Sequence, residues 1–580
     1  MTNADVARVF TEIADLMEIR GDDSFRVNSY RRVARSVEDL AEEVTTLAAR
    51  GELTKLQGIG KGSADRIKEL LDTGTIELRE ELLREVPGTL LEILRIPGLG
   101  PKKAALLWRE RGVDSLASLK AALDGGKLAG LKGFAEKSIN SIREGIEFLA
   151  RVAGRTRLGP ASEVAQRYRG LIAAMPGVQR VECAGSLRRG AESVGDLDLL
   201  CICDDGPRIV EAFTKLDGVR KVLASGETKG SVLVERGGGK EIQVDLRVVP
   251  AESFGAALQY FTGSKQHNVR LREMAVKRGW TLNEYSLSDE AAGKTIASTT
   301  EEEIYAALGL PWIPPELRED RGEFELRQTP ADLLRVEDIR GDLHMHTTAS
   351  DGSHTIEQMV NAAKARGYAY ICITDHSQSS VIANGLKPER LREHIRAVRD
   401  VGARYSDITV WVGSEVDILG DGRLDYPDDL LAELDWVVAS IHAGQGKDIA
   451  HNTERTLAAI RNPFVNAIGH PTGRIINRRD AMPLDIETIG KEAARTGTAL
   501  EINASSYRLD LKDQHARLAR DLGAKIVINC DAHAVEQFDQ MPFGVATARR
   551  AWLRKQDVLN TQSAAEIAAF VKKKRDAMGQ

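Results

Sequence analysis

The sequence is poor in cysteine and in long apolar runs, and each shortage excludes a class of protein. Only five of the 580 residues are cysteines, and they lie in apolar, strand-like stretches instead of a spaced framework, which indicates a reducing compartment without disulfides. No apolar run approaches the roughly 18 residues of a membrane span. The N-terminus lacks the basic-then-apolar pattern of a signal sequence. We therefore expect a cytoplasmic protein without a membrane partner.

The chain also lacks a large excess of charge of either sign. Its formal net charge of −6 argues against a uniformly basic nucleic-acid coat, although local basic grooves remain compatible with it. A hydrophobic fraction of 42% and a charged fraction of 29% are typical of a globular protein. A length of 580 residues is too great for one core and predicts about three or four domains.

The most informative stretch is GSLRRGAESVGDLD at residues 185–198. Asp196 and Asp198 alternate with leucines, so in a strand both carboxylates share one face. Asp245 occupies a similar polar position in the alternating run IQVDLRV at residues 242–248. Alone, the Asp-x-Asp spacing also fits a turn or a solvated strand edge. Combined, the three aspartates predict a two-metal site for Mg²⁺ or a similar ion.

The same stretch offers groups that suit a nucleotide triphosphate. The hydroxyl of Ser186, the guanidinium of Arg189 and the backbone at Gly195 can bind phosphate oxygens beside such metals. One metal would activate an attacking 3′-hydroxyl and the other would steady the leaving pyrophosphate. The pattern therefore predicts nucleotidyl transfer.

These residues resemble the family X DNA polymerases, the group that includes polymerase beta. The match continues through YFTGS at residues 260–264 and NEY at residues 283–285. The resemblance implies that Asp196, Asp198 and Asp245 bind catalytic Mg²⁺ or Mn²⁺, with Arg247 beside them. It also implies a set of nucleotide-binding positions: Ser186, Arg189, Gly195, Arg157, Tyr260, Phe261, Gly263, Asn268 and Arg272.

The resemblance assigns separate tasks within that set. Tyr260 would discriminate against ribose, Asn268 would touch the minor-groove edge of the incoming base, and Arg272 would touch the templating position. Without the resemblance, Tyr260 and Phe261 fit ordinary core aromatics. The implied substrates are a dNTP and gapped or primer–template DNA.

The amino-terminal region shows helical apolar spacing and two similar glycine turns. LQGIGKG at residues 56–62 and IPGLGPK at residues 96–102 each precede a helical segment, so backbone N–H groups point outward where a DNA phosphate can bind. They resemble helix-hairpin-helix motifs, which implies sequence-independent DNA contacts and bound Na⁺ or K⁺. The positions concerned are Gly58, Gly60, Lys61, Gly98, Gly100 and Lys102. A structural helix cap is the alternative for any single copy, and a weaker third copy at residues 128–133 fits a structural turn.

One departure concerns the 5′-deoxyribose phosphate lyase activity of polymerase beta, which uses a Schiff-base lysine. In this sequence Arg66 stands at the matching position, with Lys61 and Lys68 nearby but not in the matching place. A guanidinium stays protonated and cannot act as that nucleophile. We expect 5′-phosphate binding without efficient lyase activity by that residue.

The carboxy-terminal part is rich in histidine. Ten of the 11 histidines occur at or after His344, and seven apolar strand-like runs alternate with helical segments after residue 339, which predicts an α/β barrel with reactive residues at the strand ends. Mixed imidazole and carboxylate ligands suit Zn²⁺, Mn²⁺ or Fe²⁺ better than Mg²⁺ or Ca²⁺. A lone histidine at a strand end is usually structural, but the whole set falls there: His344, His346, His376, Glu415, His442, His470, Asp531 and His533.

This set resembles the PHP (polymerase and histidinol phosphatase) domain through the motifs DLHMH, TDHS, GSE, SIHA, GHP and DAH. The resemblance implies a phosphoesterase site with up to three ions, Mn²⁺, Zn²⁺ or both. One ion would be held by His344, His346, Glu415 and Asp531, a second by Glu415, His442 and His470, and a third by Asp351, His376 and His533. Asp375 is expected to partner an imidazole. Four histidines are expected on the surface: His354, His394, His451 and His515.

The expected fold is multidomain α/β: a helical helix-hairpin-helix region, a nucleotidyltransferase palm with a mixed sheet, and a distorted (β/α)7 PHP barrel. The expected domains are a small helical DNA-binding domain at 1–85, a fingers-type domain with the second hairpin at 86–150, a palm at 151–255, a thumb-type nucleotide-selection domain at 256–317, a linker at 318–338 and a PHP domain at 339–580.

The expected function is gap-filling DNA synthesis in base-excision or break repair, by a monomer near the nucleoid. The PHP part is expected to act as a 3′→5′ exonuclease or 3′-end-processing enzyme, with abasic-site endonuclease as a further activity. Two alternatives remain open for it: a small-molecule phosphoesterase fused to a DNA-binding unit, and a repair scaffold whose metals are structural. Open sites rich in ligands argue against the scaffold, since structural zinc sites are usually closed cages.

Overall fold

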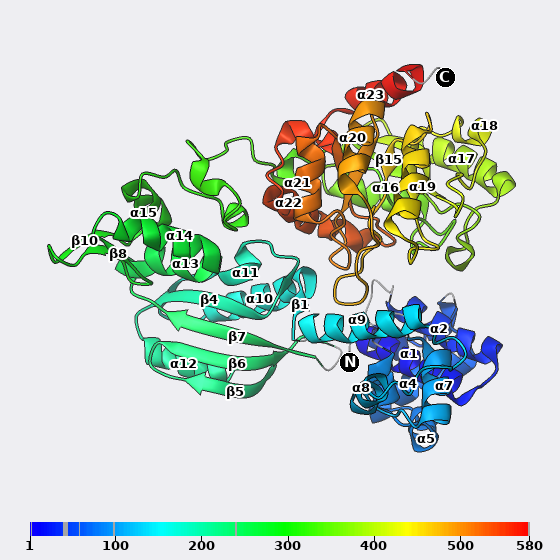
Figure 1. Cartoon of the computed structure of the whole chain (residues 1–580), viewed down its shortest axis with the longest axis horizontal. Helices are drawn as coiled ribbons and strands as arrows, with labels where there is room; N and C mark the ends of the chain where they lie inside the picture. Colours follow the sequence, from blue (N-terminus) through cyan, green and yellow to red (C-terminus); the bar gives the residue numbers. More distant parts are fainter. Residues whose placement is uncertain are drawn as a thin grey trace. The chain divides into compact units, whose positions relative to one another are not determined.

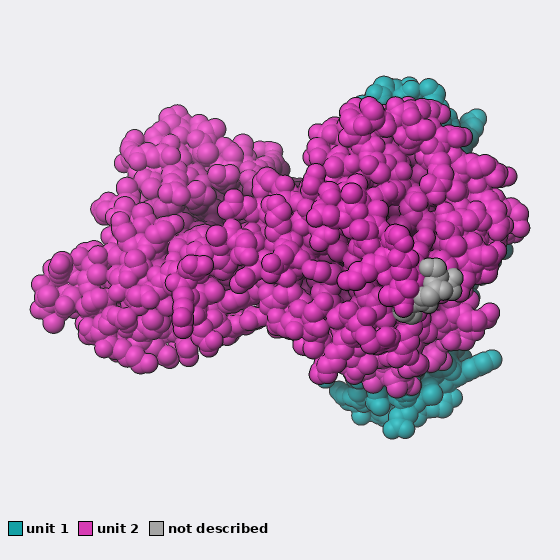
Figure 2. Space-filling view, turned by 90° about the horizontal axis from the view of Figure 1, so that it is seen from above, with its two compact units in different colours: residues 1–155, 236–241, 477–479 teal, residues 156–235, 242–476, 480–580 magenta. Residues whose placement is uncertain are grey.

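The computed structural model describes residues 1–580 except 2, 39–43, 57, 95, 97–98, 153, 238–239 and 578–580. The chain forms two compact units (Figure 2): residues 1–155 with 236–241 and 477–479, and residues 156–235 with 242–476 and 480–580. Among the described helices, none has both the length and the apolar character that a membrane crossing needs.

The first unit is helical. Its helices are α1 (Asn3–Arg20), α2 (Ser24–Glu38), α3 (Val44–Ala49), α4 (Lys61–Thr73), α5 (Glu77–Glu85), α6 (Leu90–Ile93), α7 (Pro101–Arg111), α8 (Leu116–Asp124) and α9 (Glu136–Val152). Their apolar faces pack into one continuous cluster that extends from Val6 to Ile142. The expected boundary after residue 85 therefore falls within a shared core.

The second unit begins with the mixed sheet that the sequence predicted (Figure 1). In spatial order its strands are β2 (Val178–Cys183), β4 (Asp196–Cys203), β7 (Glu241–Val248), β6 (Lys229–Glu235) and β5 (Val219–Ser225). β4 runs antiparallel to β2 and parallel to β7. Leu197 and Leu199 of β4 enter a core with α10 (Leu158–Ala173) and α12 (Gly206–Thr214), so the alternating Asp196 and Asp198 take the other face.

A thumb-type segment follows the sheet. It contains α13 (Phe254–Thr262), α14 (Lys265–Val276), a small sheet of β8 (Thr281–Leu282), β9 (Leu287–Asp289) and β10 (Lys294–Ala297), and α15 (Glu301–Ala307).

The segment 318–338, which was expected as a linker, is packed against the thumb-type segment at its start. Arg318 is fully buried and its guanidinium pairs with both carboxylate oxygens of Glu301, at 2.6 and 3.0 Å. Glu323 is also fully buried, 2.8 Å from Nδ1 of His267. The proline-rich and charged composition indicated a solvated segment, but these charges find buried partners far away in the sequence, which composition cannot reveal.

The remaining chain folds into a parallel seven-stranded barrel sheet, as predicted. The strands follow chain order: β11 (Gly341–Asp342), β12 (Tyr370–Ile373), β13 (Thr409–Asp417), β14 (Trp436–Ser440), β15 (Ala467–Ile468), β16 (Ala499–Asn503) and β17 (Ile526–Asn529). A parallel bridge between Met345 and Ala532 joins the continuations of the first and last strands, which nearly closes the barrel. Helices connect the strands, among them α16 (Ile356–Ala365), α17 (Pro388–Gly402), α19 (Ile449–Arg461), α20 (Ile486–Thr496), α21 (Asp513–Asp521) and α22 (Met541–Arg550).

The prediction that four histidines lie on the surface was wrong for His394. It is 6% exposed on α17, and its Nε2 lies 2.8 Å from a carboxylate oxygen of Asp375. The other three, His354, His451 and His515, are half-buried.

Candidate functional site

The three predicted palm aspartates share one face of neighbouring strands. Asp198 of β4 is the direct lateral partner of Asp245 of β7, and Asp196 stands two residues earlier on β4, opposite Gln243. Gln243 donates a hydrogen bond of 2.8 Å to Asp245, and Lys229 of β6 lies 3.2 Å from the same carboxylate. The sheet register therefore brings together carboxylates that are far apart in the sequence.

Burial and the negative charges of neighbouring carboxylates change the pKa of Asp198. Burial, together with the charges of Asp196 and Asp245, raises the pKa of Asp198 to about 7. A Cβ atom at Gly185 would lie only 2.3 Å from the Asp198 carboxylate, so glycine is required at the start of α11 (Gly185–Arg188). Crowded carboxylates of this kind suit divalent cations, which relieve their repulsion.

The turn around Arg189, at the end of α11, is held by partly buried ion pairs; because the sequence predicted nucleotide binding here, we call it the nucleotide turn. Nε of Arg189 lies 3.0 Å from Glu319, and its Nη1 donates to the carbonyl of Thr262 at 2.5 Å. The neighbouring Arg188 pairs with Glu301 at 2.7 Å. Ser186 lies within α11 and Gly195 lies in the bend between β3 (Ser193–Val194) and β4. The turn therefore approaches the YFTGS segment, whose Thr262 ends α13.

The other expected nucleotide contacts lie in the YFTGS segment at residues 260–264 and on α14. Tyr260 and Phe261 form an edge-to-face pair with ring centroids 5.1 Å apart, and Arg247 lies over Phe261 at 4.4 Å. Gly263 follows with a left-handed φ of +69°, 3.2 Å from Arg189 when a Cβ atom is added. Asn268 donates to the carbonyl of Tyr260 at 2.7 Å, while Arg272 is exposed on α14.

Arg157 is placed differently from the triphosphate role that the resemblance implied. Its backbone pairs with Ser193, close to Gly195, but its guanidinium stacks 3.3 Å from the ring centroid of Tyr507 in the barrel. No sequence pattern indicates this contact, because the two residues are 350 positions apart.

The two described helix-hairpin-helix turns have nearly identical geometry. Gly60 and Gly100 precede α4 and α7 with φ of −82° and −84° and ψ of 173° each, and neither helix start has a side-chain cap. Lys61 and Lys102 are exposed in the first turns of these helices. Gly58 has a left-handed φ of +86°, and its counterpart Gly98 lies outside the described residues. The open first-turn N–H groups suit an anion such as a DNA phosphate.

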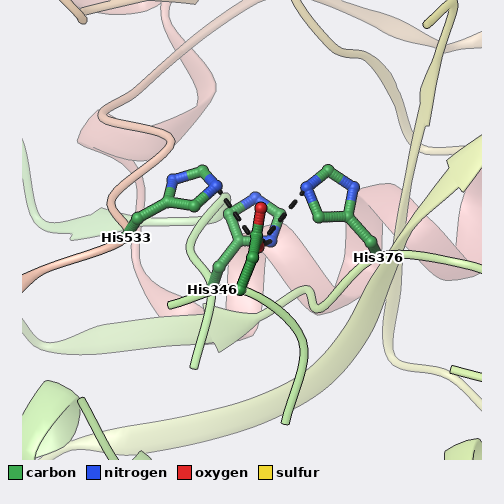
Figure 3. A group of neighbouring side chains, drawn as sticks. His346, His376 and His533 are labelled. Atoms are coloured by element: carbon green, nitrogen blue, oxygen red, sulfur yellow. Dashed lines mark ion pairs between the residues drawn. The ribbon is translucent and has the colours of Figure 1, made fainter. Parts of the chain in front are cut away.

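The predicted barrel ligands converge at the ends of the parallel strands. Their ligand atoms lie within 4.8 Å of one another in three overlapping groups: His346, Asp351, His376 and His533; His344, His346, Glu415 and Asp531; and His376, Glu415 and His442. Figure 3 shows His346, His376 and His533 converging. A carboxylate oxygen of Asp351 lies 3.4–4.0 Å from their ring nitrogens. No comparable group of three occurs at the palm among the described residues, since its aspartates stand further apart.

Glu415 is the hub of this cluster, which we call the metal rim. It is 1% exposed and its oxygens lie within 2.9–3.6 Å of ring nitrogens of five histidines: His344, His346, His376, His442 and His470. Burial alone would raise the pKa of Glu415. The positive charges of His442, His376 and His344 outweigh burial and lower this pKa well below its usual value. Burial and the nearby rings of His533 and His376 lower the pKa of His346 to about 4, which keeps it neutral and able to bind a metal.

The rim residues fit bound metal ions. Within the described part of the chain, several buried polar atoms of the rim have no hydrogen-bond partner: Nε2 of His344, Nδ1 of His346, Nδ1 of His376 and both carboxylate oxygens of Glu415. Unpaired buried polar atoms are costly and rare, and here they all belong to residues of the three ligand groups. Imidazole and carboxylate donors together suit Zn²⁺, Mn²⁺ or Fe²⁺.

Two carboxylates orient rim histidines from behind, and a third, Asp375, holds the neighbouring backbone; the sequence identified only Asp375. Glu501 of β16 lies 2.8 Å from Nδ1 of His344, and Asp417 of β13 lies 2.5 Å from Nδ1 of His442. Such partners fix the tautomer of a ligating imidazole. Asp375 was expected to partner an imidazole, and it pairs with His394 while accepting a hydrogen bond from the Thr347 backbone at 2.9 Å. Both missed residues stand on strands of the barrel near the predicted ligands, which is the signal that could have indicated them.

Comparisons with known proteins agree with this arrangement. A family model described as DNA polymerase beta thumb matches residues 257–319, and one described as PHP domain matches residues 342–505. A helix-hairpin-helix domain model matches residues 1–76, and a SAM-like helix-hairpin-helix tandem model matches residues 90–147.

Three relatives cover different parts of the chain. The protein named DNA polymerase/3′-5′ exonuclease PolX from Bacillus subtilis (strain 168) is 39% identical over 573 residues, 99% of this chain and 100% of the relative. DNA polymerase lambda from Rattus norvegicus is 28% identical over 55% of this chain and 56% of its own length. A protein named as a probable phosphatase from Thermoanaerobacter sp. (strain X514) is 30% identical over 41% of this chain and 96% of its own length.

A mixed sheet with three aspartates, joined to a parallel barrel with a metal-ligating rim, defines a nucleotidyltransferase with a metal-binding barrel. The end-to-end match to a relative that is 39% identical makes the assignment specific. The chain belongs to the family X DNA polymerases that carry a C-terminal PHP domain.

Proposed function

We propose that the palm sheet adds deoxynucleotides to a DNA 3′ end and that the metal rim hydrolyses phosphodiesters from a 3′ end. The observation that carries the first part is the lateral pairing of Asp198 with Asp245. The second part is supported by the convergence of five histidines on Glu415. The name of the Bacillus subtilis relative contains both activities.

At the palm, Mg²⁺ or Mn²⁺ held by Asp196, Asp198 and Asp245 would supply activation of the 3′-hydroxyl and charge for the leaving pyrophosphate. The residues of the chain bind and orient the nucleotide. Ser186, Arg189 and the backbone at Gly195 take the triphosphate, and the remaining contacts are proposed for Tyr260, Phe261, Gly263, Asn268 and Arg272. Arg157 would have to leave Tyr507 to join them. Short gaps in repair intermediates are the proposed substrate.

At the rim, up to three Mn²⁺ or Zn²⁺ ions would supply an activated water and would offset charge on the leaving oxygen. Glu415 holds the imidazoles of neighbouring groups together, while Glu501 and Asp417 fix the rings of His344 and His442. We propose 3′→5′ exonuclease or 3′-end-processing activity, with abasic-site cleavage as a further activity.

The amino-terminal hairpins would hold the DNA backbone. Lys61 and Lys102 stand at the open helix starts, where Na⁺ or K⁺ would also bind, and such contacts are independent of sequence. We further propose that the chain acts as a monomer on chromosomal DNA in the cytoplasm, with palm, thumb-type and PHP domains in the order that the sequence predicted.

A second candidate concerns the barrel alone, because the relative from Thermoanaerobacter that covers it is named as a probable phosphatase. In that case the rim would hydrolyse a small phosphate monoester. Steady-state rates on histidinol phosphate and on a 3′-recessed duplex decide between the two. We expect the duplex to have the higher kcat/KM, and the opposite order would favour the phosphatase.

The proposed separation of activities is tested with Asp245→Asn and His344→Ala, and with Glu290→Gln, which is exposed in the thumb-type segment, as a matched control. Asp245→Asn should abolish insertion into a one-nucleotide gap and leave shortening of a single strand intact. His344→Ala should show the reverse. A metal-depleted wild type that stays folded but loses shortening would exclude a purely structural role for the rim metals.

A further inference from the structure

Two adjacent apolar side chains stand out beside the metal rim. Val381 and Ile382, in the turn η6 (Val381–Ala383), are 80% and 84% exposed. Elsewhere in the described part of the barrel, no large apolar side chain exceeds the 51% exposure of Ile449. An exposed apolar pair is costly in water, and when it adjoins a functional site it commonly indicates a binding surface.

The turn is fastened to the rim at its beginning. The hydroxyls of Ser379 and Ser380 donate to one oxygen of Asp417 at 2.5 and 2.8 Å. The other oxygen of Asp417 orients His442 at 2.5 Å. The residues immediately before Val381 therefore share a carboxylate with a metal-rim histidine.

The end of the turn is hydrogen-bonded to the segment just before Asp351, which belongs to another of the ligand groups. Nδ2 of Asn384 lies 3.3 Å from the carbonyls of Ala349 and Ser350, and Ser350 precedes Asp351 in the chain. Arg390 reinforces this contact by donating to the carbonyl of Ala349 at 2.7 Å. The apolar pair consequently stands between the part of the rim around His442 and the part around Asp351.

The backbone holds the pair in a defined position. Leu386 donates from its backbone N–H to the carbonyl of His376 at 2.8 Å, so the loop leaves the rim and returns to it. Asn384 has a left-handed φ of +55°. A Cβ atom at Gly385 would lie 1.9 Å from the carbonyl oxygen of Ser377, so the closure requires glycine. A turn closed in this way presents its side chains with little loss of entropy on binding.

We propose that Val381 and Ile382 receive the face of the nucleobase at the DNA 3′ end whose phosphodiester lies on the metal rim. This inference rests on the proposed nuclease function of the barrel. Within one nucleotide of a phosphodiester, the sugar and the base are the only groups available to meet an apolar surface. Aliphatic side chains contact and unstack bases in other DNA-binding proteins. The rim supplies charge for the phosphate, and the turn supplies the apolar contact that the charged rim lacks.

The test pairs a substrate change with a protein change. The enzyme variant is Val381→Ser/Ile382→Ser, and the control is Val336→Ser, which is 40% exposed in η5 (Val336–Asp338) just before the first strand of the barrel, away from the strand ends. The substrates are single-stranded oligonucleotides that end in an ordinary 3′ nucleotide or in an abasic tetrahydrofuran nucleotide. Release of the terminal nucleotide gives kcat/KM, and metal content is measured for each protein.

We expect the wild type and the control to prefer the base-bearing end by roughly five- to tenfold, somewhat less than aromatic stacking would give. The double variant should lose that preference by slowing only on the base-bearing end, with unchanged metal content. An equal loss on both ends, or no loss on either, would overturn the inference. A wrong assignment of the nuclease activity to the barrel gives a different result. In that case His344→Ala would still shorten the oligonucleotide.

Discussion

Arg550 of the barrel donates a hydrogen bond of 2.9 Å to the main-chain carbonyl of Arg189, the residue proposed to hold the triphosphate. The same guanidinium lies 2.8 Å from Glu319, which also binds Nε of Arg189 at 3.0 Å. Asp513 completes the pairing of Arg550 at 3.0 Å. One carboxylate is thus shared between an arginine of the barrel and an arginine of the nucleotide turn.

This sharing predicts that Arg550→Met weakens nucleotide binding. Without Arg550, the carboxylate of Glu319 is paired with Arg189 alone. Arg189 is then bound more tightly by Glu319 and is less available to the triphosphate. We expect KM for the dNTP to rise roughly tenfold, the lower end of the scale of one charge-assisted hydrogen bond, with kcat little changed. Single-nucleotide insertion kinetics measure this, with Arg554→Met as the control, since Arg554 pairs loosely with Asp332 at 3.6 Å. An unchanged KM, or a kcat that falls with it, would contradict the explanation.

Glu301 is predicted to be a strong determinant of stability. It is 4% exposed and neutralises both the fully buried Arg318 at 2.6 Å and Arg188 at 2.7 Å. Glu301→Gln removes one charge from a buried group and should cost about 3–5 kcal/mol of unfolding free energy. Denaturant unfolding measures the change, and the exposed neighbour Glu302→Gln is the control. Equal stabilities of the two variants would reject this assignment.

The same residue predicts a pH dependence. Burial alone would raise the pKa of Glu301, but Arg318 and Arg188 lower it well below its ordinary value of 4.5. The stabilisation is therefore fully present above pH 4.5 and is lost as the pH falls below it, where the unfolded chain takes up the proton first. We expect the wild type to lose more unfolding free energy than Glu301→Gln between pH 5 and pH 3. Parallel curves for the two proteins would be the contrary result.

Metal content should depend on Glu415 more than on His533. Glu415 contacts five imidazoles, whereas His533 belongs to only one of the three ligand groups. Glu415→Gln should therefore lose more than one ion per chain, and His533→Gln at most one. Elemental analysis of the purified proteins counts the ions. Equal losses would show that the groups bind independently.

The first hairpin should lack the Schiff-base reaction. Arg66 is a guanidinium near Glu69, 4.0 Å away, and it cannot form an imine. Borohydride treatment with a 5′-deoxyribose phosphate end should trap little covalent complex in the wild type. If the wild type and Arg66→Ala both formed abundant covalent complex, a lysine elsewhere in the chain would be the nucleophile. The variants Lys61→Ala and Lys68→Ala would then show which lysine it is.

Patterns local in sequence predicted the elements that carry the chemistry. The alternation around Asp196 and Asp198 fixes their common face, and parallel topology alone gathers ligands such as His376 and His470 at one end of a barrel. Pairings between distant segments were not predictable in this way. The buried pair of Arg318 with Glu301 packs the start of the segment 318–338 that was expected as a linker, and His394 is buried beside Asp375. Glu319 and Arg550 are 231 positions apart, so no spacing rule joins them.

The central claim is that two separate metal sites build and degrade the same DNA strand. A single time course tests it most directly: a 5′-labelled primer on a one-nucleotide gap is incubated with Mg²⁺ or Mn²⁺, first without and then with dNTP. The account predicts shortening followed by extension for the wild type, shortening alone for Asp245→Ala, and extension alone for His344→Ala. Loss of both activities in either variant, or shortening that persists in His344→Ala, would contradict it.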